Sequence, residues 1–203
     1  MLNRFARTFF TKLFTPLARL FLRMGISPDV VTIVGTVGVC LGALTLYPRH
    51  EFFWGTIVVS VFALSDTLDG VMARLSDRSS KWGAYLDSTL DRVADSAIFG
   101  GLVLWYSGDG DTPYLAALAL ACLISGSVVS YSKARAEGLG MTANVGIAER
   151  AERVIVVLIA TGLVGLGVSE MLLTVVLALL ALASLITVVQ RMLEVRRQAF
   201  TAA

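Results

Sequence analysis

The sequence predicts an all-α integral membrane protein with six transmembrane helices and an N-terminal amphipathic helix at the membrane interface. Two observations lead to this fold class. First, 56% of the 203 residues are hydrophobic, whereas a soluble domain is about 45–50% apolar even when glycine is counted. Second, apolar segments recur along the chain, and each is close to the roughly 20 residues that a helix needs to cross a bilayer.

Residues 1–25 predict the interfacial helix. Arginines and a lysine alternate here with leucine and phenylalanine. At about 100° per residue, one side of the helix collects apolar side chains, namely Leu2, Phe5, Phe9, Leu13 and Leu20. A basic amphipathic helix of this kind lies in the membrane interface and should bend at Pro16. A soluble leader is the alternative, but the phenylalanine-rich face favours the membrane, and the compact apolar core of a cleavable signal peptide is missing.

Six apolar segments follow the interfacial helix and make up a predicted bundle over residues 30–190. We place them at 30–47, 52–74, 83–107, 113–135, 147–167 and 170–190. The connections are short, so successive helices should be antiparallel neighbours within a single domain spanning residues 1–203. In the first segment Gly35, Gly38 and Gly42 share one helix face, which predicts close helix packing there.

The charge distribution predicts the orientation of these segments. With six spans, 16 of the 17 lysines and arginines lie on or near the side that carries both termini, and only Arg49 lies on the other. The positive-inside rule then places both termini in the cytoplasm of a multi-pass protein of the cell membrane. The net charge of +2 gives no reason to expect a nucleic-acid partner.

The few cysteine and histidine residues limit the chemistry. Cys40 and Cys122 lie inside apolar segments, without the spacing of a disulfide framework or a metal site, so they are expected to be packing residues. His50 is the single histidine and lies in a short polar connection. A zinc site or a histidine-based catalytic triad is therefore not expected.

Four aspartates interrupt the apolar pattern. Asp66 and Asp69 are three residues apart near the end of the second segment, and Asp87 and Asp91 are four apart near the start of the third. Each pair shares a helix face, and the short connection lets the two pairs face each other at the cytoplasmic side. Hard carboxylate oxygens suit Mg²⁺ or Mn²⁺. Four of them make room for two ions about 3.5–4 Å apart.

Neighbouring residues fit a phosphate-containing ligand. Gly70 and Gly83 leave space for the close approach of a ligand, and Arg74 could hold a phosphate. Two alternatives remain. A structural network with Arg74, Arg78, Lys81 and Arg92 would be a costly way to stabilise a membrane bundle. An ion or solute transporter would carry charged residues across both halves of the bilayer, whereas here the outer halves of the spans lack them.

The aspartate segment resembles the signature of the CDP-alcohol phosphotransferases. The matching pattern is Asp66-x2-Asp69-Gly70-x2-Ala73-Arg74-x8-Gly83-x3-Asp87-x3-Asp91. The resemblance covers the whole chain and implies a membrane homodimer of phospholipid biosynthesis. Such an enzyme transfers the phosphatidyl group of a CDP-linked lipid, here CDP-diacylglycerol, to an alcohol and releases CMP.

The resemblance also implies roles for individual residues. Asp66, Asp69, Asp87 and Asp91 would bind the metal ions, and Asp91 would also be the general base in an in-line attack by the acceptor hydroxyl. A covalent phosphoryl-enzyme stays open. Contacts to the CDP-lipid are expected from the turn before the first span and from the aspartate segment, namely from Asp29, Val30, Val31, Thr32, Gly70, Arg74 and either Ser79 or Ser80. The family commonly has asparagine where this chain has Asp29. Ser27 and Pro28 also predict a plain helix start, as N-cap and first residue.

The acceptor alcohol has to be inferred from basic residues farther along the chain. These residues lie at the cytoplasmic ends of the last three spans, namely Lys133, Arg135, Arg150, Arg153 and Arg191. They could simply reflect the positive-inside bias, or pair with Glu137, Glu149 and Glu152. Together they favour a phosphorylated acceptor, either inositol 1-phosphate or glycerol 3-phosphate.

Two further segments favour the inositol compound. Residues 130–140 and 146–153 resemble the corresponding segments of actinobacterial phosphatidylinositol-phosphate synthases. This resemblance implies that Lys133, Arg153 and Arg191 bind the phosphate of inositol 1-phosphate. The predicted product is then phosphatidylinositol phosphate.

Overall fold

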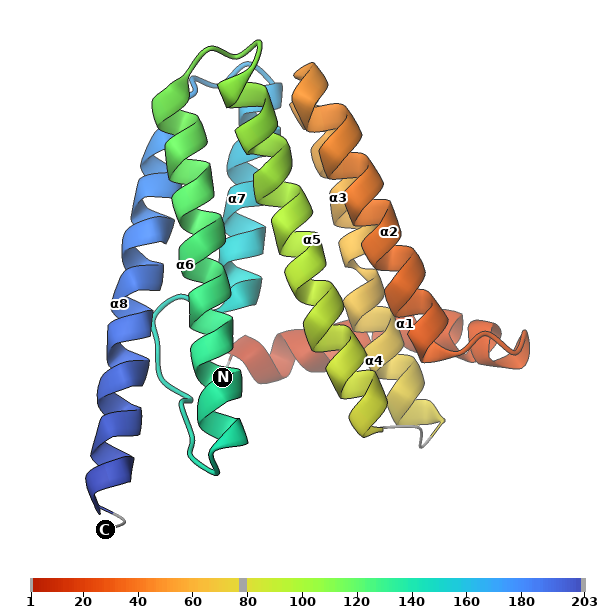
Figure 1. Ribbon diagram of the computed structural model, residues 1–203. Coiled ribbons are helices and arrows are strands. Elements are labelled where there is room, and N and C mark those ends of the chain that lie inside the picture. Colours follow the sequence, from red (N-terminus) through yellow and green to blue (C-terminus); the bar gives the residue numbers. More distant parts are fainter. Residues whose placement is uncertain (1, 77–79, 202–203) are drawn as a thin grey trace. The chain divides into compact units, whose positions relative to one another are not determined.

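The computed structural model describes residues 2–76 and 80–201, with side chains described from Leu13 onward. Arg78 and Ser79 therefore lie outside the described residues. Every regular element within these ranges is a helix (Figure 1), which confirms the all-α prediction. The elements are α1 (Leu2–Arg23), α2 (Pro28–Leu46), the 3₁₀ helix η1 (Tyr47–Arg49), α3 (Phe52–Ala63), α4 (Ser65–Leu75), α5 (Lys81–Ser107), α6 (Pro113–Gly138), α7 (Arg150–Gly165) and α8 (Met171–Thr201).

Four helical stretches in the described part of the chain are long and apolar enough to cross a membrane. They are Pro28–Arg49, Phe52–Leu75, Pro113–Gly138 and Met171–Thr201. Of the other two predicted spans, α5 carries Asp87, Asp91, Arg92 and Asp95, and α7 has only 16 residues. The structure therefore supports a membrane protein with several apolar helices, while the count of six stays a prediction.

Several helix boundaries differ from the hydropathy pattern, and each difference has a local cause. The second apolar segment is interrupted at Leu64, where Ser65 Oγ donates a hydrogen bond to the carbonyl of Phe62 at 2.6 Å. α8 continues to Thr201, eleven residues past the predicted end. Its last turns are polar, so the hydropathy pattern does not include them. There Arg197 pairs with Glu194 at 2.8 Å, an i,i+3 contact that supports the helix.

The chain divides by packing into two units. The first unit contains Met1–Gly42 and Ile57–Ile98, and the second contains Ala43–Thr56 and Phe99–Ala203. Helices α2, α3 and α5 contribute residues to both. The candidate acidic site lies entirely in the first unit, and the predicted acceptor residues lie in the second.

Apolar packing in the first unit orients α4. Its buried residues Leu68, Val71 and Met72 form a hydrophobic cluster with Ala18 of α1 and Val31 of α2. At 100° per residue these three side chains lie on the face of α4 opposite to Asp66, and Asp69 lies at the edge of that face. Packing of this face therefore directs Asp66 away from the hydrophobic cluster and places Asp69 beside it.

The glycine face predicted for the first span packs against α3 and its continuation. A Cβ atom on Gly38 would collide with the ring of Phe62, and one on Gly42 would lie 2.8 Å from a methyl group of Val58. A Cβ atom on Gly35 would collide with the side chain of Ser65. The small residues therefore let the two helices approach within the first unit, as predicted.

The second unit is built on α6, α7 and α8. Figure 1 shows α6 and α8 side by side. Their shared core includes Cys122, whose thiol donates a hydrogen bond to the carbonyl of Leu177 at 3.1 Å. Aromatic residues make a separate cluster, in which His50 stacks on Trp105 with ring centroids 4.4 Å apart. Cys122 is thus a packing residue, as the sequence predicts, and His50 packs against aromatic rings.

Candidate functional site

Two acidic helix faces meet in the first unit, one on α4 and one on α5. On α4 the face runs from Asp66 through Asp69 to Ala73, and on α5 it runs from Gly83 through Asp87 to Asp91, with spacings of three and four residues. The start of α5 is fixed by Ser80, whose Oγ accepts a hydrogen bond from the Gly83 N–H at 2.9 Å. Helical spacing and this cap together place the two faces.

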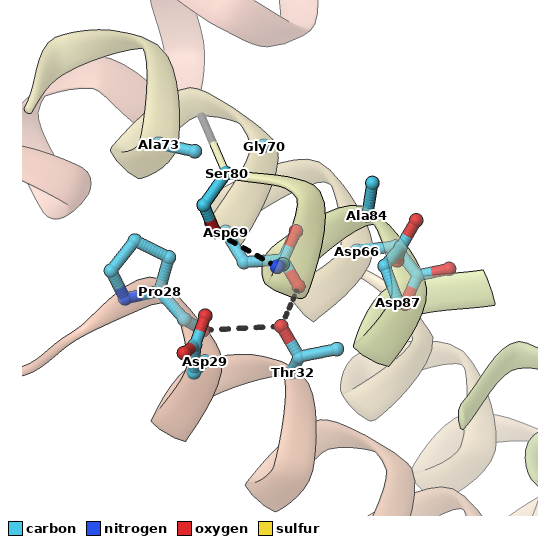
Figure 2. A pocket seen from close by; sticks show the side chains of 11 residues that line it. Pro28, Asp29, Thr32, Asp66, Asp69, Gly70, Ala73, Ser80, Ala84 and Asp87 are labelled. Atoms are coloured by element: carbon cyan, nitrogen blue, oxygen red, sulfur yellow. Dashed lines mark hydrogen bonds between the residues drawn. The ribbon is translucent and has the colours of Figure 1, made fainter. Parts of the chain in front are cut away.

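Three of the four predicted aspartates come together. Carboxylate oxygens of Asp66, Asp87 and Asp91 all lie within 4.8 Å of one another. Figure 2 shows the side chains of Asp66 and Asp87 next to each other. Three solvent-accessible carboxylates at this separation repel one another unless a cation lies among them. Their hard oxygen ligands fit a divalent cation such as Mg²⁺ or Mn²⁺.

Asp69 has a different environment. Its side chain is buried, with 7% exposed, and its Oδ2 accepts a hydrogen bond from Thr32 Oγ1 at 2.5 Å. The same hydroxyl lies 3.1 Å from the carbonyl of Pro28, so its one proton has two acceptors (Figure 2). Asp69 thus connects α4 to the first turn of α2, beside the three clustered carboxylates.

A cavity of about 230 Å³ lies between these elements. It is lined by Pro28, Asp29 and Thr32 of α2, by Asp66, Asp69, Gly70 and Ala73 of α4, and by Ser80, Gly83, Ala84 and Asp87 around the start of α5 (Figure 2). The N-terminus of α2 therefore lies at this cavity. The N-cap residue of α2 is Ser27, whose Oγ lies 3.4 Å from the backbone nitrogen of Val30. A helix N-terminus favours an anionic ligand.

The residues predicted to contact a CDP-lipid divide into two groups. Asp29, Thr32, Gly70 and Ser80 line the cavity. Arg74 lies close to it, because a Cβ atom on Gly70 would be 3.5 Å from the Arg74 guanidinium. Val30 is exposed and Val31 packs in the hydrophobic cluster, and neither side chain lines the cavity.

Sequence reasoning missed other residues at this site. Ala84 lines the cavity, as does Ala73, which the signature contains without a predicted role; their helical spacing from Asp87 and Gly70 was a signal that could have found both contacts. Trp82 donates a hydrogen bond from Nε1 to Asp29 Oδ2 at 3.1 Å. This contact joins positions 53 residues apart, and no local pattern predicts it.

An ion-pair group extends the acidic face along α5. One nitrogen of Arg92, Nη2, lies 3.7 Å from Asp91 Oδ2 and 3.5 Å from Asp95 Oδ2. Asp95 is buried, with 7% exposed. The guanidinium places a positive charge between the clustered carboxylate of Asp91 and this buried acid. Asp91 therefore faces a cation of its own helix as well as the carboxylates of Asp66 and Asp87.

The predicted acceptor residues lie in the second unit, and backbone carbonyls position its two buried arginines. Arg153, with 2% exposed, donates from Nη1 to Ala148 O at 3.1 Å and from Nη2 to Gly126 O at 3.5 Å. Arg191, with 6% exposed, donates from Nε to Val145 O at 3.0 Å and from Nη1 to Val129 O. Lys133 is half-buried and lies 3.9 Å from Glu137.

A protein-family model decides the family. The model described as CDP-alcohol phosphatidyltransferase matches residues 25–189, which include both acidic faces and Arg153 and end two residues before Arg191. The chain belongs to the CDP-alcohol phosphatidyltransferase family. It is therefore a transferase, and its apolar helices make it a membrane enzyme.

Similar proteins narrow the position of this phosphatidyltransferase within the family. A phosphatidylinositol phosphate synthase of Streptomyces avermitilis is 54% identical over 204 residues, covering 98% of this chain and 84% of the relative. The synthase of the same name from Mycolicibacterium smegmatis is 44% identical over 192 residues, covering 94% of this chain and 86% of the relative.

Solved structures agree with the sequence relatives. The crystal structure of Mycobacterium tuberculosis phosphatidylinositol phosphate synthase with CDP-DAG bound matches with a TM-score of 0.87 and 44% identity, covering 91% of this chain and 94% of that one. A second crystal structure of that enzyme, in complex with manganese and citrate, matches with a TM-score of 0.83 at 44% identity, with 90% and 88% covered. The phosphatidyltransferase described here therefore has the fold of these synthases.

Proposed function

We propose that this phosphatidyltransferase transfers the phosphatidyl group of CDP-diacylglycerol to inositol 1-phosphate, producing phosphatidylinositol phosphate and CMP. The two relatives at 54% and 44% identity, both named phosphatidylinositol phosphate synthase, support this acceptor. The similar structure with CDP-DAG bound supports the donor. The observation that carries the chemistry is the cluster of Asp66, Asp87 and Asp91 beside a cavity that the first turn of α2 also lines.

The reaction is a direct in-line displacement at the lipid-linked phosphorus. The acceptor hydroxyl oxygen forms a bond to this phosphorus while the bond to the CMP oxygen breaks. Asp91 is the general base that takes the hydroxyl proton, and CMP leaves with the electron pair of the broken bond. Asp91 suits this role because it belongs to the carboxylate cluster, where a carboxylate oxygen can accept the hydroxyl proton.

Divalent cations complete the acidic site. Asp66, Asp69, Asp87 and Asp91 would hold two Mg²⁺ ions, with Mn²⁺ as a substitute. The three carboxylates within 4.8 Å support this, as does the similar structure in complex with manganese. When bound, such ions neutralise pyrophosphate charge and stabilise the leaving oxygen.

The CDP part of the donor would occupy the 230 Å³ cavity. Asp29, Thr32, Gly70 and Ser80 line it and would contact the nucleotide, with Arg74 beside the diphosphate. The side chains of Val30 and Val31 lie outside the cavity, so only their backbone atoms could contact the nucleotide.

The phosphate of the acceptor would bind Lys133, Arg153 and Arg191. The hydrogen bonds to carbonyl groups occupy two of the five N–H groups of Arg191, so the same guanidinium can also donate to a phosphate. Two buried arginines with fixed planes suit a phosphate better than an uncharged alcohol. This favours a phosphorylated acceptor over free inositol.

The membrane arrangement is part of the proposal. Six spans would be formed by α2, α3 with α4, α5, α6, α7 and α8 as one domain over residues 1–203. α1 would lie in the interface, where its exposed Leu13, Leu17 and Leu20 could enter the lipid. The charge asymmetry supports cytoplasmic termini and a cytoplasmic active site in the cell membrane. A homodimer is proposed from the family resemblance.

CMP release tests this function. Purified protein is incubated with CDP-diacylglycerol, Mg²⁺ and one alcohol at a time: inositol 1-phosphate, glycerol 3-phosphate, free inositol, or none. We expect CMP release to depend on inositol 1-phosphate and on the metal. CMP release with glycerol 3-phosphate but not with inositol 1-phosphate would refute inositol 1-phosphate as the acceptor. Solute counterflow in liposomes without any CMP release would refute the enzyme function and favour a transporter.

A further inference from the structure

The connection between α6 and α7 in the second unit is an irregular segment that lies against α8. We call residues 139–149 the α6–α7 link; it is drawn in teal in Figure 1. Side chains of α8 bind its backbone at three places. Gln198 pairs with both backbone groups of Thr142, Arg191 binds the carbonyl of Val145, and Thr187 binds two successive N–H groups.

Thr187 makes the most complete of these contacts. Its side chain is fully buried, and its Oγ1 accepts hydrogen bonds from the N–H groups of Ile147 and Ala148, each at 3.2 Å. The same hydroxyl donates to Ala183 O at 2.8 Å, so its donor and both of its acceptor positions are used. The hydroxyl therefore fixes two peptide units of the link.

Gly146 allows this contact. Its φ of +142° is a backbone conformation that favours glycine, and a Cβ atom there would collide with the methyl group of Thr187. The methyl group thus occupies the space left by the missing side chain, while the hydroxyl binds the next two residues. Gly146 therefore lets the backbone of the link pack directly against Thr187 of α8.

The two fixed peptide units lie directly between the carbonyl groups that bind the two buried arginines. Ala148 donates its N–H to Thr187 and accepts, at its carbonyl, the hydrogen bond from Arg153 Nη1 at 3.1 Å. Val145, on the other side of Gly146, accepts from Arg191 Nε at 3.0 Å. A displacement of residues 145–148 would therefore move a hydrogen-bond partner of each guanidinium.

We propose that Thr187 is a positioning residue for the phosphorylated acceptor. It contacts neither substrate, and it acts through Ala148 on Arg153 and through Gly146 and Val145 on Arg191. This rests on the proposed function, since it takes both arginines as phosphate ligands. A purely structural role in joining α7 to α8 would lower stability without a selective effect on one substrate.

Matched substitutions on α8 test the role. Thr187→Val keeps the shape and removes the hydroxyl, whereas Thr187→Ser keeps the hydroxyl. Ser184→Ala is the control: Ser184 lies one turn earlier, is equally buried, and its hydroxyl makes no hydrogen bond among the described residues. Because small misplacements of binding groups can cost up to ~100-fold, we expect Thr187→Val to raise the KM for inositol 1-phosphate about tenfold. The KM for CDP-diacylglycerol should stay within about twofold, and Thr187→Ser and Ser184→Ala should resemble the wild type.

Two kinetic results would overturn the proposal: an unchanged acceptor KM in Thr187→Val, or an equal rise in both KM values. Amide hydrogen exchange without substrates supplies a readout that does not depend on activity. Exchange at Ile147 and Ala148 should become at least tenfold faster in Thr187→Val, and unchanged exchange would also overturn the proposal. If wild-type enzyme used glycerol 3-phosphate in place of inositol 1-phosphate, the proposed acceptor would fail, and the same KM comparison on glycerol 3-phosphate would still decide the role of Thr187.

Discussion

The clustered carboxylates of the first unit and the buried arginines of the second unit differ in their exposure and in their contacts with the protein. Asp66, Asp87 and Asp91 are solvent-accessible and close together, so each lies next to groups of its own charge. Arg153 and Arg191 are almost fully buried, and each donates to backbone carbonyls of other segments. The geometry of the acidic cluster suits divalent cations, whereas the guanidinium groups of the arginines are oriented by backbone carbonyls.

This difference predicts different sensitivities. The acidic cluster should respond to loss of a carboxylate or of the metal, because its binding energy comes from the bound ions. The arginines should respond to changes in the backbone around them, because carbonyl groups set the planes of the guanidinium groups. Substitutions can therefore separate the chemical step from recognition of the acceptor.

The largest effect is expected for Asp91→Asn. Loss of a general base costs about 10²–10⁴-fold in rate, so CMP release should fall by that factor while the protein still folds. The matched control is Asp95→Asn, one turn farther along α5, which should keep activity within about tenfold because Asp95 lies outside the carboxylate cluster. Wild-type CMP release from Asp91→Asn would contradict the role of Asp91.

The next effect is expected for Arg153→Lys. This change keeps the charge but removes the planar fork that bonds to Ala148 and Gly126. We expect the KM for inositol 1-phosphate to rise by roughly 10–100-fold with little change in the KM for CDP-diacylglycerol. Arg135→Lys, at the exposed end of α6, should leave both values unchanged. Equal increases of the two KM values for Arg153→Lys would argue against an acceptor site at this position.

A smaller effect, on stability, is expected for Gly38→Ala. The added methyl group would overlap the Phe62 ring, and such overpacking costs about 1–3 kcal/mol. The thermal midpoint of the detergent-solubilised protein should fall by several degrees, to about the extent that a loss of this size predicts. Gly138→Ala meets no atom within 4 Å and should be neutral. An unchanged midpoint for Gly38→Ala would contradict close packing of α2 on Phe62.

The smallest effect is expected for Ser27→Ala. The Ser27 hydroxyl lies 3.4 Å from the Val30 N–H, which is long for a hydrogen bond, so its loss should cost at most ~1 kcal/mol. Because α2 begins at the cavity, we also expect a slight rise, about twofold, in the KM for CDP-diacylglycerol. Ser27→Asn retains a capping group and should behave as wild type. Identical kinetics and stability for Ser27→Ala would show that the cap is dispensable.

Periodicity predicted more of the acidic site than of the basic one. The spacings of Asp66 from Asp69 and of Asp87 from Asp91 are local, so helical geometry alone placed each pair on one face. The partners of Asp69 and Asp29 could not be predicted in this way. Thr32 and Trp82 reach them from other helices, and such contacts follow from tertiary packing.

The helix ends and the α6–α7 link likewise depend on contacts that local sequence patterns do not predict. Hydropathy located the apolar segments but not the break at Leu64 or the polar extension of α8, since both depend on hydrogen bonds and ion pairs. The sequence pointed to Arg153 and Arg191 as cations at segment ends. It contained no sign that Thr187 fixes the peptide units between the carbonyl groups to which they bind, because Thr187 lies 39 or more positions from the link residues that it contacts.

The most direct test of separate metal and acceptor sites measures two quantities on the same variants. Mn²⁺ binding is followed by electron paramagnetic resonance without substrates, and the KM for inositol 1-phosphate is measured in parallel. Asp87→Asn should weaken Mn²⁺ binding at least about tenfold, while Lys133→Ala should leave it within twofold and raise the acceptor KM. Equal weakening of Mn²⁺ binding by both variants, or an unchanged Mn²⁺ affinity in Asp87→Asn, would contradict separate metal and acceptor sites.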